Sequence, residues 1–234
     1  MFNFASKSVL VTGGTSGIGR AVAQAFVKAG ANVIAAGLPG AETSEDGFRY
    51  ERLDVRDIEA VQRVIATIPT LDVLVNAAGM IRRDDEFDID VFEQVIDVNL
   101  TGTMRLCAAA RPHLQKTRGC IVNIASLLSF FGGARVPAYS ASKGGIAQLT
   151  RSLALAWASE GIRVNAVAPG WIATPLTQAL QDDPARSAGL LTRTPFGRWG
   201  LPEEVAGPVL FLCSDAASFM TGAIVPVDGG YSAA

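Results

Sequence analysis

The chain has 234 residues, enough to bury the core of one α/β domain, and we expect residues 1–234 to form that single domain. Its 20 basic residues nearly balance its 22 acidic residues and form no basic run, which argues against nucleic acid as a partner. Three widely spaced cysteines and a single histidine argue against a disulfide framework, and they predict no metal site.

Short apolar runs alternate with longer amphipathic runs, the pattern of a parallel sheet covered by helices on both faces. Strands are predicted at residues 8–12, 32–36, 50–54, 72–76, 119–124, 163–168 and 223–227. Helices are predicted at residues 17–29, 57–67, 90–116, 137–160, 175–192 and 202–214. The polar segment 37–47 is predicted to be an exposed loop, with little room for a helix between the second and third strands.

The first predicted strand and helix are joined by a glycine-rich loop, Thr12-Gly-Gly-Thr-Ser-Gly-Ile-Gly19. Glycine lets a backbone approach a pyrophosphate closely, and a helix N-terminus offers free N–H groups and the positive end of its dipole. The loop therefore indicates a cradle for a dinucleotide. The alternative is a glycine-rich turn that binds nothing.

Two polar residues interrupt the apolar pattern further along the chain. Asn99 lies in a predicted helix, where a buried amide needs hydrogen-bond partners; the alternative is an asparagine that kinks the helix and is satisfied by backbone alone. Ser126 follows the fifth predicted strand, at the carboxyl edge where open α/β sheets bind their ligands.

Tyr139 and Lys143 stand four residues apart in a predicted helix, so their side chains share one face. Bringing a phenol pKa from about 10 to ~7.5 takes about 3.4 kcal/mol, and a close ammonium can supply much of this. Such a tyrosine could take a proton from an alcohol or give one to a carbonyl. By itself, however, a Tyr-x-x-x-Lys pair is usually an ordinary pair of helix-surface neighbours.

Taken together, the motifs resemble those of the short-chain dehydrogenase/reductases over essentially the whole chain. They are Thr12-Gly13-x-x-x-Gly17-x-Gly19, Asn76-Ala-Ala-Gly79, Asn99, Ser126, Tyr139-x-x-x-Lys143 and Pro169-Gly170. The resemblance implies a Rossmann-type doubly wound sheet of seven mainly parallel strands with helices on both faces. It implies that Tyr139 is the catalytic acid/base, that Lys143 lowers its pKa and binds the nicotinamide ribose, that Ser126 holds the substrate oxygen, and that Asn99 keeps a water in a proton relay.

The same resemblance implies a nicotinamide dinucleotide as cofactor. The expected contacts are Gly13, Thr15, Ser16, Gly17, Ile18, Gly19, Leu38, Asp54, Val55, Asn76, Ala77, Ala78, Gly79, Tyr139, Lys143, Pro169, Gly170, Ile172 and Thr174. Position 37 lacks the acid that binds the ribose diol of NAD, and position 38 lacks the arginine that binds the 2′-phosphate of NADP. Because Ser16 is Lys or Arg in many NADP-dependent relatives, NAD(H) is favoured, with NADP(H) as the alternative.

Three stretches resemble a subgroup that acts on sugar acids, the 2-dehydro-3-deoxy-D-gluconate 5-dehydrogenases, also described as 2-deoxy-D-gluconate 3-dehydrogenases. These stretches are residues 78–85, 124–139 and 197–202. Guanidinium groups suit carboxylates, so Arg82, Arg83 and Arg135 are candidate substrate contacts, together with Ser126 and Tyr139. Each arginine could instead make a surface or intersubunit ion pair.

The sequence thus predicts an NAD(P)-dependent oxidoreductase that interconverts a secondary alcohol and a ketone, on a sugar acid such as a keto-deoxy-gluconate. One alternative is a 3-oxoacyl thioester reductase acting on acyl carrier protein, with Phe130, Phe131 and Trp171 lining an apolar pocket. Another is a catalytically silent nucleotide-sensing protein. Relatives are commonly homotetramers, and the absence of a leader or of a long apolar segment predicts a cytoplasmic protein without a membrane partner.

Overall fold

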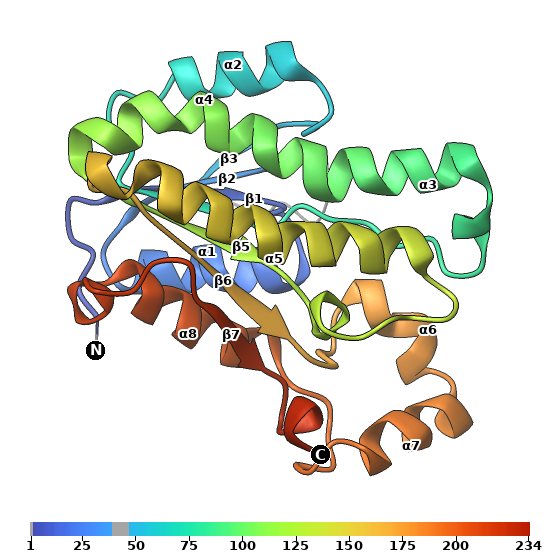
Figure 1. Ribbon diagram of the computed structural model, residues 1–234. Helices are drawn as coiled ribbons and strands as arrows, with labels where there is room; N and C mark the ends of the chain where they lie inside the picture. Colours follow the sequence, from blue (N-terminus) through green and yellow to red (C-terminus); the bar gives the residue numbers. More distant parts are fainter. Residues whose placement is uncertain (1, 39–46) are drawn as a thin grey trace.

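The computed structural model describes residues 2–38 and 47–234; most of the predicted loop 37–47 lies outside this part. Seven strands form one all-parallel sheet in the order β3-β2-β1-β4-β5-β6-β7 (Figure 1). The strands are β1 (Ser8–Thr12), β2 (Asn32–Gly37), β3 (Arg49–Arg52), β4 (Val73–Asn76), β5 (Cys120–Ile124), β6 (Arg163–Pro169) and β7 (Ile224–Val227). The prediction of a doubly wound, mainly parallel sheet is confirmed. Strand order reverses between β1 and β4, and ligands bind at such switch points.

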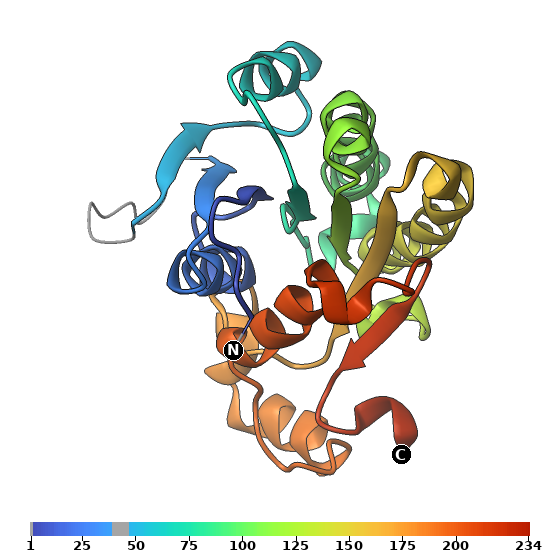
Figure 2. The same cartoon turned by 90° about the vertical axis from the view of Figure 1, so that its left-hand side faces the viewer.

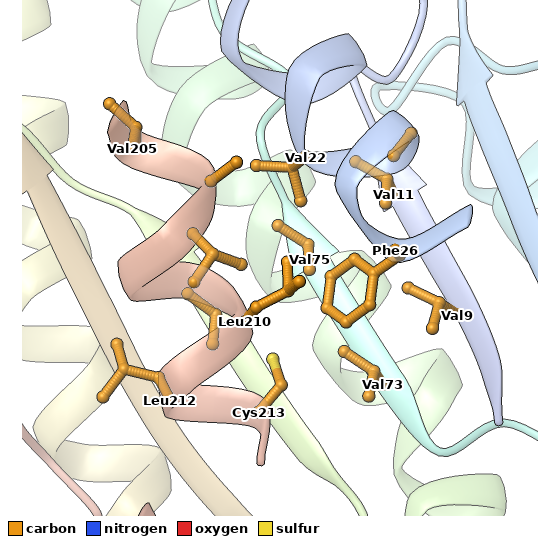
Figure 3. Close-up of a cluster of buried hydrophobic side chains, with 14 of the residues drawn as sticks. Val9, Val11, Val22, Phe26, Val73, Val75, Val205, Leu210, Leu212 and Cys213 are labelled. Atoms are coloured by element: carbon orange, nitrogen blue, oxygen red, sulfur yellow. The ribbon is translucent and has the colours of Figure 1, made fainter. Parts of the chain in front are cut away.

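Helices cover both faces of the sheet, because neighbouring strand residues point to opposite sides. On one face α1 (Gly17–Lys28) lies beside α8 (Pro202–Cys213), as Figure 2 shows in blue and orange-red. There Val9, Phe26 and Leu210 belong to one buried apolar cluster (Figure 3). On the other face, α2 (Ile58–Ala66), α4 (Gly102–Thr117) and α5 (Pro137–Trp157) pack over Leu10.

The helix predicted at 90–116 is interrupted. The structure has α3 (Ile89–Ile96), a π-helical turn at Asp97–Thr101 and then α4. Asn99 lies in this turn, and its hydrogen bonds reach segments far away in the sequence. Such turns are rare and occur frequently at functional sites. Local sequence patterns predict the helix but not this turn.

The prediction of a single helix at 175–192 was wrong. A 3-10 turn (Pro175–Thr177) is followed by α6 (Gln178–Gln181) and α7 (Pro184–Thr192). Pro184 has no backbone N–H to continue α6, and Asp183 caps the new helix by accepting from the N–H of Arg186 at 3.1 Å. Likewise, α5 ends at Trp157, before a 3-10 turn at Ala158–Glu160.

Within the described ranges, no helix combines the length and apolarity needed to cross a bilayer. In the same ranges, no group of three His, Cys, Asp or Glu side chains is placed to hold a metal. The three cysteines are free and buried, as expected for small apolar residues.

Candidate active site

A cleft of about 440 Å³ lies at the carboxyl ends of the central strands. Fourteen of the predicted site residues line it: Gly13, Ser16, Gly17, Ile18, Gly19, Ala77, Gly79, Ser126, Tyr139, Lys143, Pro169, Gly170, Ile172 and Thr174. Five further lining residues were not predicted: Ile124, Ala125, Pro175, Leu176 and Thr177. The last three directly follow Thr174, so the prediction stopped one turn too early.

The glycine loop is shaped by close backbone contacts. Gly13 has a φ of +66°, and a Cβ added there would lie 2.6 Å from the backbone nitrogen of Ala78. A Cβ at Gly19 would lie 2.2 Å from the carbonyl oxygen of Gly13. At the start of α1, Ser16 makes no side-chain cap and the first turn carries no acid, so the N–H groups stay available to an anion. This cradle fits the pyrophosphate of a dinucleotide.

Tyr139, Ser126 and Lys143 converge on the cleft from α5 and from the end of β5. The Ser126 side chain lies close enough to the Tyr139 phenol to lower its pKa by hydrogen bonding. The Lys143 ammonium is buried, donates to the carbonyl oxygen of Ile124 at 2.7 Å and lies 5.5 Å from the centre of the Tyr139 ring. The reactive groups named from the sequence are therefore brought together.

The expected lowering of the Tyr139 pKa is not found. Burial raises its pKa, and the hydrogen bond from Ser126 opposes this only in part. Lys143 lies over the ring and donates to a carbonyl, so its charge is not directed at the phenol oxygen. Burial lowers the pKa of Lys143 itself to about 8.

Asn99 is 1% exposed, and its amide bridges two segments of the site wall. Its Nδ2 donates to the Met80 carbonyl and to the Ser142 hydroxyl, both at 3.0 Å, while its Oδ1 accepts from the N–H of Met80 at 2.8 Å. Its own carbonyl accepts from the Thr103 hydroxyl at 2.9 Å. The alternative was an asparagine that kinks the helix and is satisfied by backbone alone. It is correct in part, because Asn99 lies in the π-helical turn, but one of its partners is the Ser142 side chain.

At the predicted adenosine end, the expected contacts lie outside the cleft. Leu38 is exposed at the end of β2. A side chain at Gly37 would meet the Thr15 hydroxyl at 3.0 Å, so the buried Thr15 crowds the position where an acid would bind the ribose. The Asp54 carboxylate binds Arg56 at 2.7 Å, and this hydrogen bond lowers the Asp54 pKa.

Three other residues that were predicted to contact the cofactor instead contact the surrounding protein. Val55 is buried against Gly102, and Ala78 packs at the edge of the core. Asn76 is buried and donates to the Asn123 side-chain oxygen at 2.9 Å. These side chains support the floor of the site.

The three candidate arginines differ in their surroundings. Arg135 forms a bidentate ion pair with Asp84, and both side chains are about half exposed, which matches the surface-pair alternative. Arg82 is exposed. Arg83 is half-buried, and both its burial and the charge of Arg135 lower its pKa. A partly buried guanidinium is stabilised by an anion, so Arg83 is the best placed of the three.

Sequence reasoning missed an aromatic cluster that includes the C-terminal segment. Trp171 and Phe131 were considered for an apolar pocket, and the structure adds Tyr231, with ring centres 6.2 Å from Trp171 and 6.4 Å from Phe131. The Arg193 guanidinium lies 4.4 Å from the centre of the Tyr231 ring. Nothing local in the sequence signals a contact across one hundred residues.

The sheet, the glycine cradle at its switch point and the adjoining Tyr, Ser and Lys define an oxidoreductase that uses a nicotinamide dinucleotide. A family model described as enoyl-(acyl carrier protein) reductase matches residues 13–232. The chain belongs to the short-chain dehydrogenase/reductase family.

Individual relatives narrow the comparison. The chain is 40% identical to 2-dehydro-3-deoxy-D-gluconate 5-dehydrogenase of Escherichia coli (strain K12), over 99% of this chain and 98% of that protein. A 3-oxoacyl-[acyl-carrier-protein] reductase of Thermotoga maritima is 39% identical, over 96% and 97%. A crystal structure assigned as a 2-deoxy-D-gluconate 3-dehydrogenase from Agrobacterium tumefaciens, with bound NADP, is 42% identical with a TM-score of 0.91, over 100% and 99%.

Proposed function

We propose that this protein interconverts a secondary alcohol and a ketone on a sugar acid of the 2-dehydro-3-deoxy-D-gluconate type. The observation that carries the proposal is the meeting of Tyr139, Ser126 and Lys143 in one cleft beside the glycine cradle. When bound, the dinucleotide supplies or accepts the hydride. The one sheet, with strands from residue 8 to residue 227, supports a single domain.

The side chains of the cleft have separate roles in the reaction. Tyr139 gives its proton to the carbonyl oxygen in reduction and takes it back in oxidation. Ser126, whose side chain adjoins the Tyr139 phenol, is placed to share that oxygen. Because burial raises the Tyr139 pKa, the protonated form dominates at neutral pH, and this is the form that ketone reduction requires. Lys143 keeps hydrogens to donate to a ribose hydroxyl besides its bond to Ile124.

Arg83 supports a carboxylate-bearing substrate. Its guanidinium is half-buried and close enough to Tyr139 for the tyrosine charge to influence its pKa. The E. coli and A. tumefaciens relatives are named for gluconate derivatives, which fits this interpretation. A 3-oxoacyl thioester has no carboxylate for Arg83, so this alternative is the weaker one.

For the cofactor we propose a preference for NAD(H). Neither Ser16 nor Leu38 provides a cation for a 2′-phosphate. Among the described residues, Arg52 is the basic residue nearest to position 37 in the sheet register, since it pairs with Gly37 across β2 and β3. Fluorescence titration should give a lower Kd for NADH than for NADPH. Tighter NADPH binding that is lost in Arg52→Gln would contradict this choice.

We further propose a cytoplasmic homotetramer. The resemblance to the family supports four copies joined through α4, α5 and the C-terminal segment. Several large apolar side chains are exposed on the isolated chain, including Leu155 on α5. Light scattering that reports a monomer would refute the assembly.

Turnover with a substrate panel tests the function. The panel contains 2-dehydro-3-deoxy-D-gluconate, 2-deoxy-D-gluconate and a 3-oxoacyl thioester, each with both cofactors. We expect the highest kcat/KM on a sugar acid. Preference for the thioester would overturn the substrate proposal, and no turnover at all would favour the silent nucleotide-binding alternative.

A further inference from the structure

Two charged side chains are buried among the described residues, Lys143 and Glu86, and both adjoin Tyr139. Glu86 lies in the 3-10 turn Asp85–Phe87 that follows β4, and only 1% of it is exposed. A carboxylate is buried only where hydrogen bonds or charges compensate for lost hydration. The partners of Glu86 therefore indicate what it does.

Each oxygen of the carboxylate accepts one backbone hydrogen bond. Oε1 accepts from the N–H of Arg82 at 2.9 Å, and Oε2 accepts from the N–H of Tyr139 at 2.8 Å. One side chain thus ties the segment that carries the candidate carboxylate-binding arginine to the residue that carries the reactive phenol. The two residues joined are 57 positions apart in the numbering, so no local turn does this.

Helix α5 depends on this contact for its cap. Val136 precedes the helix and offers no capping side chain, and the first turn contains no acid. An anion at a helix N-terminus is favourable, and bonds to a charged acceptor are stronger than neutral ones. The Glu86 carboxylate, which comes from a different segment, supplies both the negative charge and the charged acceptor at the N-terminus of α5.

We propose that Glu86 is a positioning residue for the reaction: its carboxylate fixes the backbone of Tyr139 against the Arg82–Arg83 segment, so that proton donor and substrate-carboxylate partner keep one relative placement. This inference rests on the proposed function for the role of Arg83. The contact itself is independent of the substrate.

The charge of Glu86 also acts on the phenol. The charged groups around Tyr139 are Glu86 from the 3-10 turn, Arg83 from the segment before it, and Lys143 from α5 itself. Glu86 raises the Tyr139 pKa and Arg83 lowers it. Removing the negative charge should therefore lower the Tyr139 pKa and move the pH midpoint of alcohol oxidation to lower pH.

The test is Glu86→Gln, which keeps the shape but loses the charge and one acceptor. We expect kcat/KM to fall about tenfold or more, the sugar-acid KM to rise, and the pH midpoint to move down. Glu204→Gln is the matched control, since Glu204 accepts from the N–H of Leu201 at 2.8 Å at the start of α8. An unmoved midpoint in Glu86→Gln, or an equal movement in the control, would overturn the proposal.

A substrate-free titration separates this inference from the proposed function. The chain has three tyrosines, so the ultraviolet difference between wild type and Tyr139→Phe reports Tyr139 alone. We expect the Tyr139 pKa to lie above the ordinary value of tyrosine in wild type, and to be lower in Glu86→Gln than in wild type. If that variant does not fold, Glu86→Asp keeps the charge and should keep the wild-type pKa. A wild-type pKa at or below about 10 would refute the role of the charge even if no substrate is turned over.

Discussion

Replacing Asn99 with alanine should loosen the wall of the cleft. The amide makes three hydrogen bonds of 2.8–3.0 Å, two to the backbone of Met80 and one to the Ser142 hydroxyl. A buried polar group that loses its partner costs about 1–3 kcal/mol, and water from the cleft can replace part of this. We expect the free energy of unfolding to fall by about 2–4 kcal/mol, equivalent to a Tm shift of roughly 5–15 °C.

Urea denaturation and thermal melting measure this loss, and kcat/KM reports the effect on the site. Activity should fall as well, because Met80 leads directly from the cleft to Arg82. Asn32→Ala removes the same atoms from an exposed position and should change stability by less than about 0.5 kcal/mol. An Asn99→Ala protein as stable as the Asn32→Ala control would refute the reasoning.

Three further predictions use other residues. Lys143 has a pKa of about 8 against 10.5 ordinarily, so the unfolded chain binds more protons between these values. Unfolding free energy should therefore rise by up to about 3 kcal/mol from pH 8 to 10.5, a rise that urea melts of Lys143→Met should lack. Arg83→Ala should raise the sugar-acid KM about tenfold or more, whereas steady-state kinetics of Arg135→Ala should show little change, because Arg135 is paired on the surface. Gly207→Ala, in an exposed helix position with nothing within 4 Å of the added Cβ, should stabilise the fold by roughly 0.5–1 kcal/mol in urea melts.

The sheet was predictable because its strands are nearly continuous apolar runs with glycine and polar residues at their ends. Tyr139, Lys143 and Ser126 followed from spacing, since the first two share a helix face and Ser126 ends a strand, whereas most other cleft residues followed from the resemblance to the family. The break before Pro184 was also readable from the sequence, because proline ends a helix and Asp183 is a good cap.

The features that escaped prediction depend on contacts between distant segments. The π-helical turn is set by Asn99 reaching Met80 and Ser142, and the cap of α5 comes from Glu86. The pKa of Tyr139 was also predicted in the wrong direction, because burial by distant segments and the charge of Glu86 raise it. Helix periodicity places Lys143 near the ring, but it does not show that the ammonium donates to Ile124.

Tyr139 is the group that moves the proton in the proposed reaction. Tyr139→Phe keeps the ring but loses the hydroxyl, and its sugar-acid turnover should be measured together with its Kd for NADH. We predict that kcat falls by a factor of about 10²–10⁴ while the Kd stays unchanged. A variant that turns over as fast as wild type would contradict the mechanism.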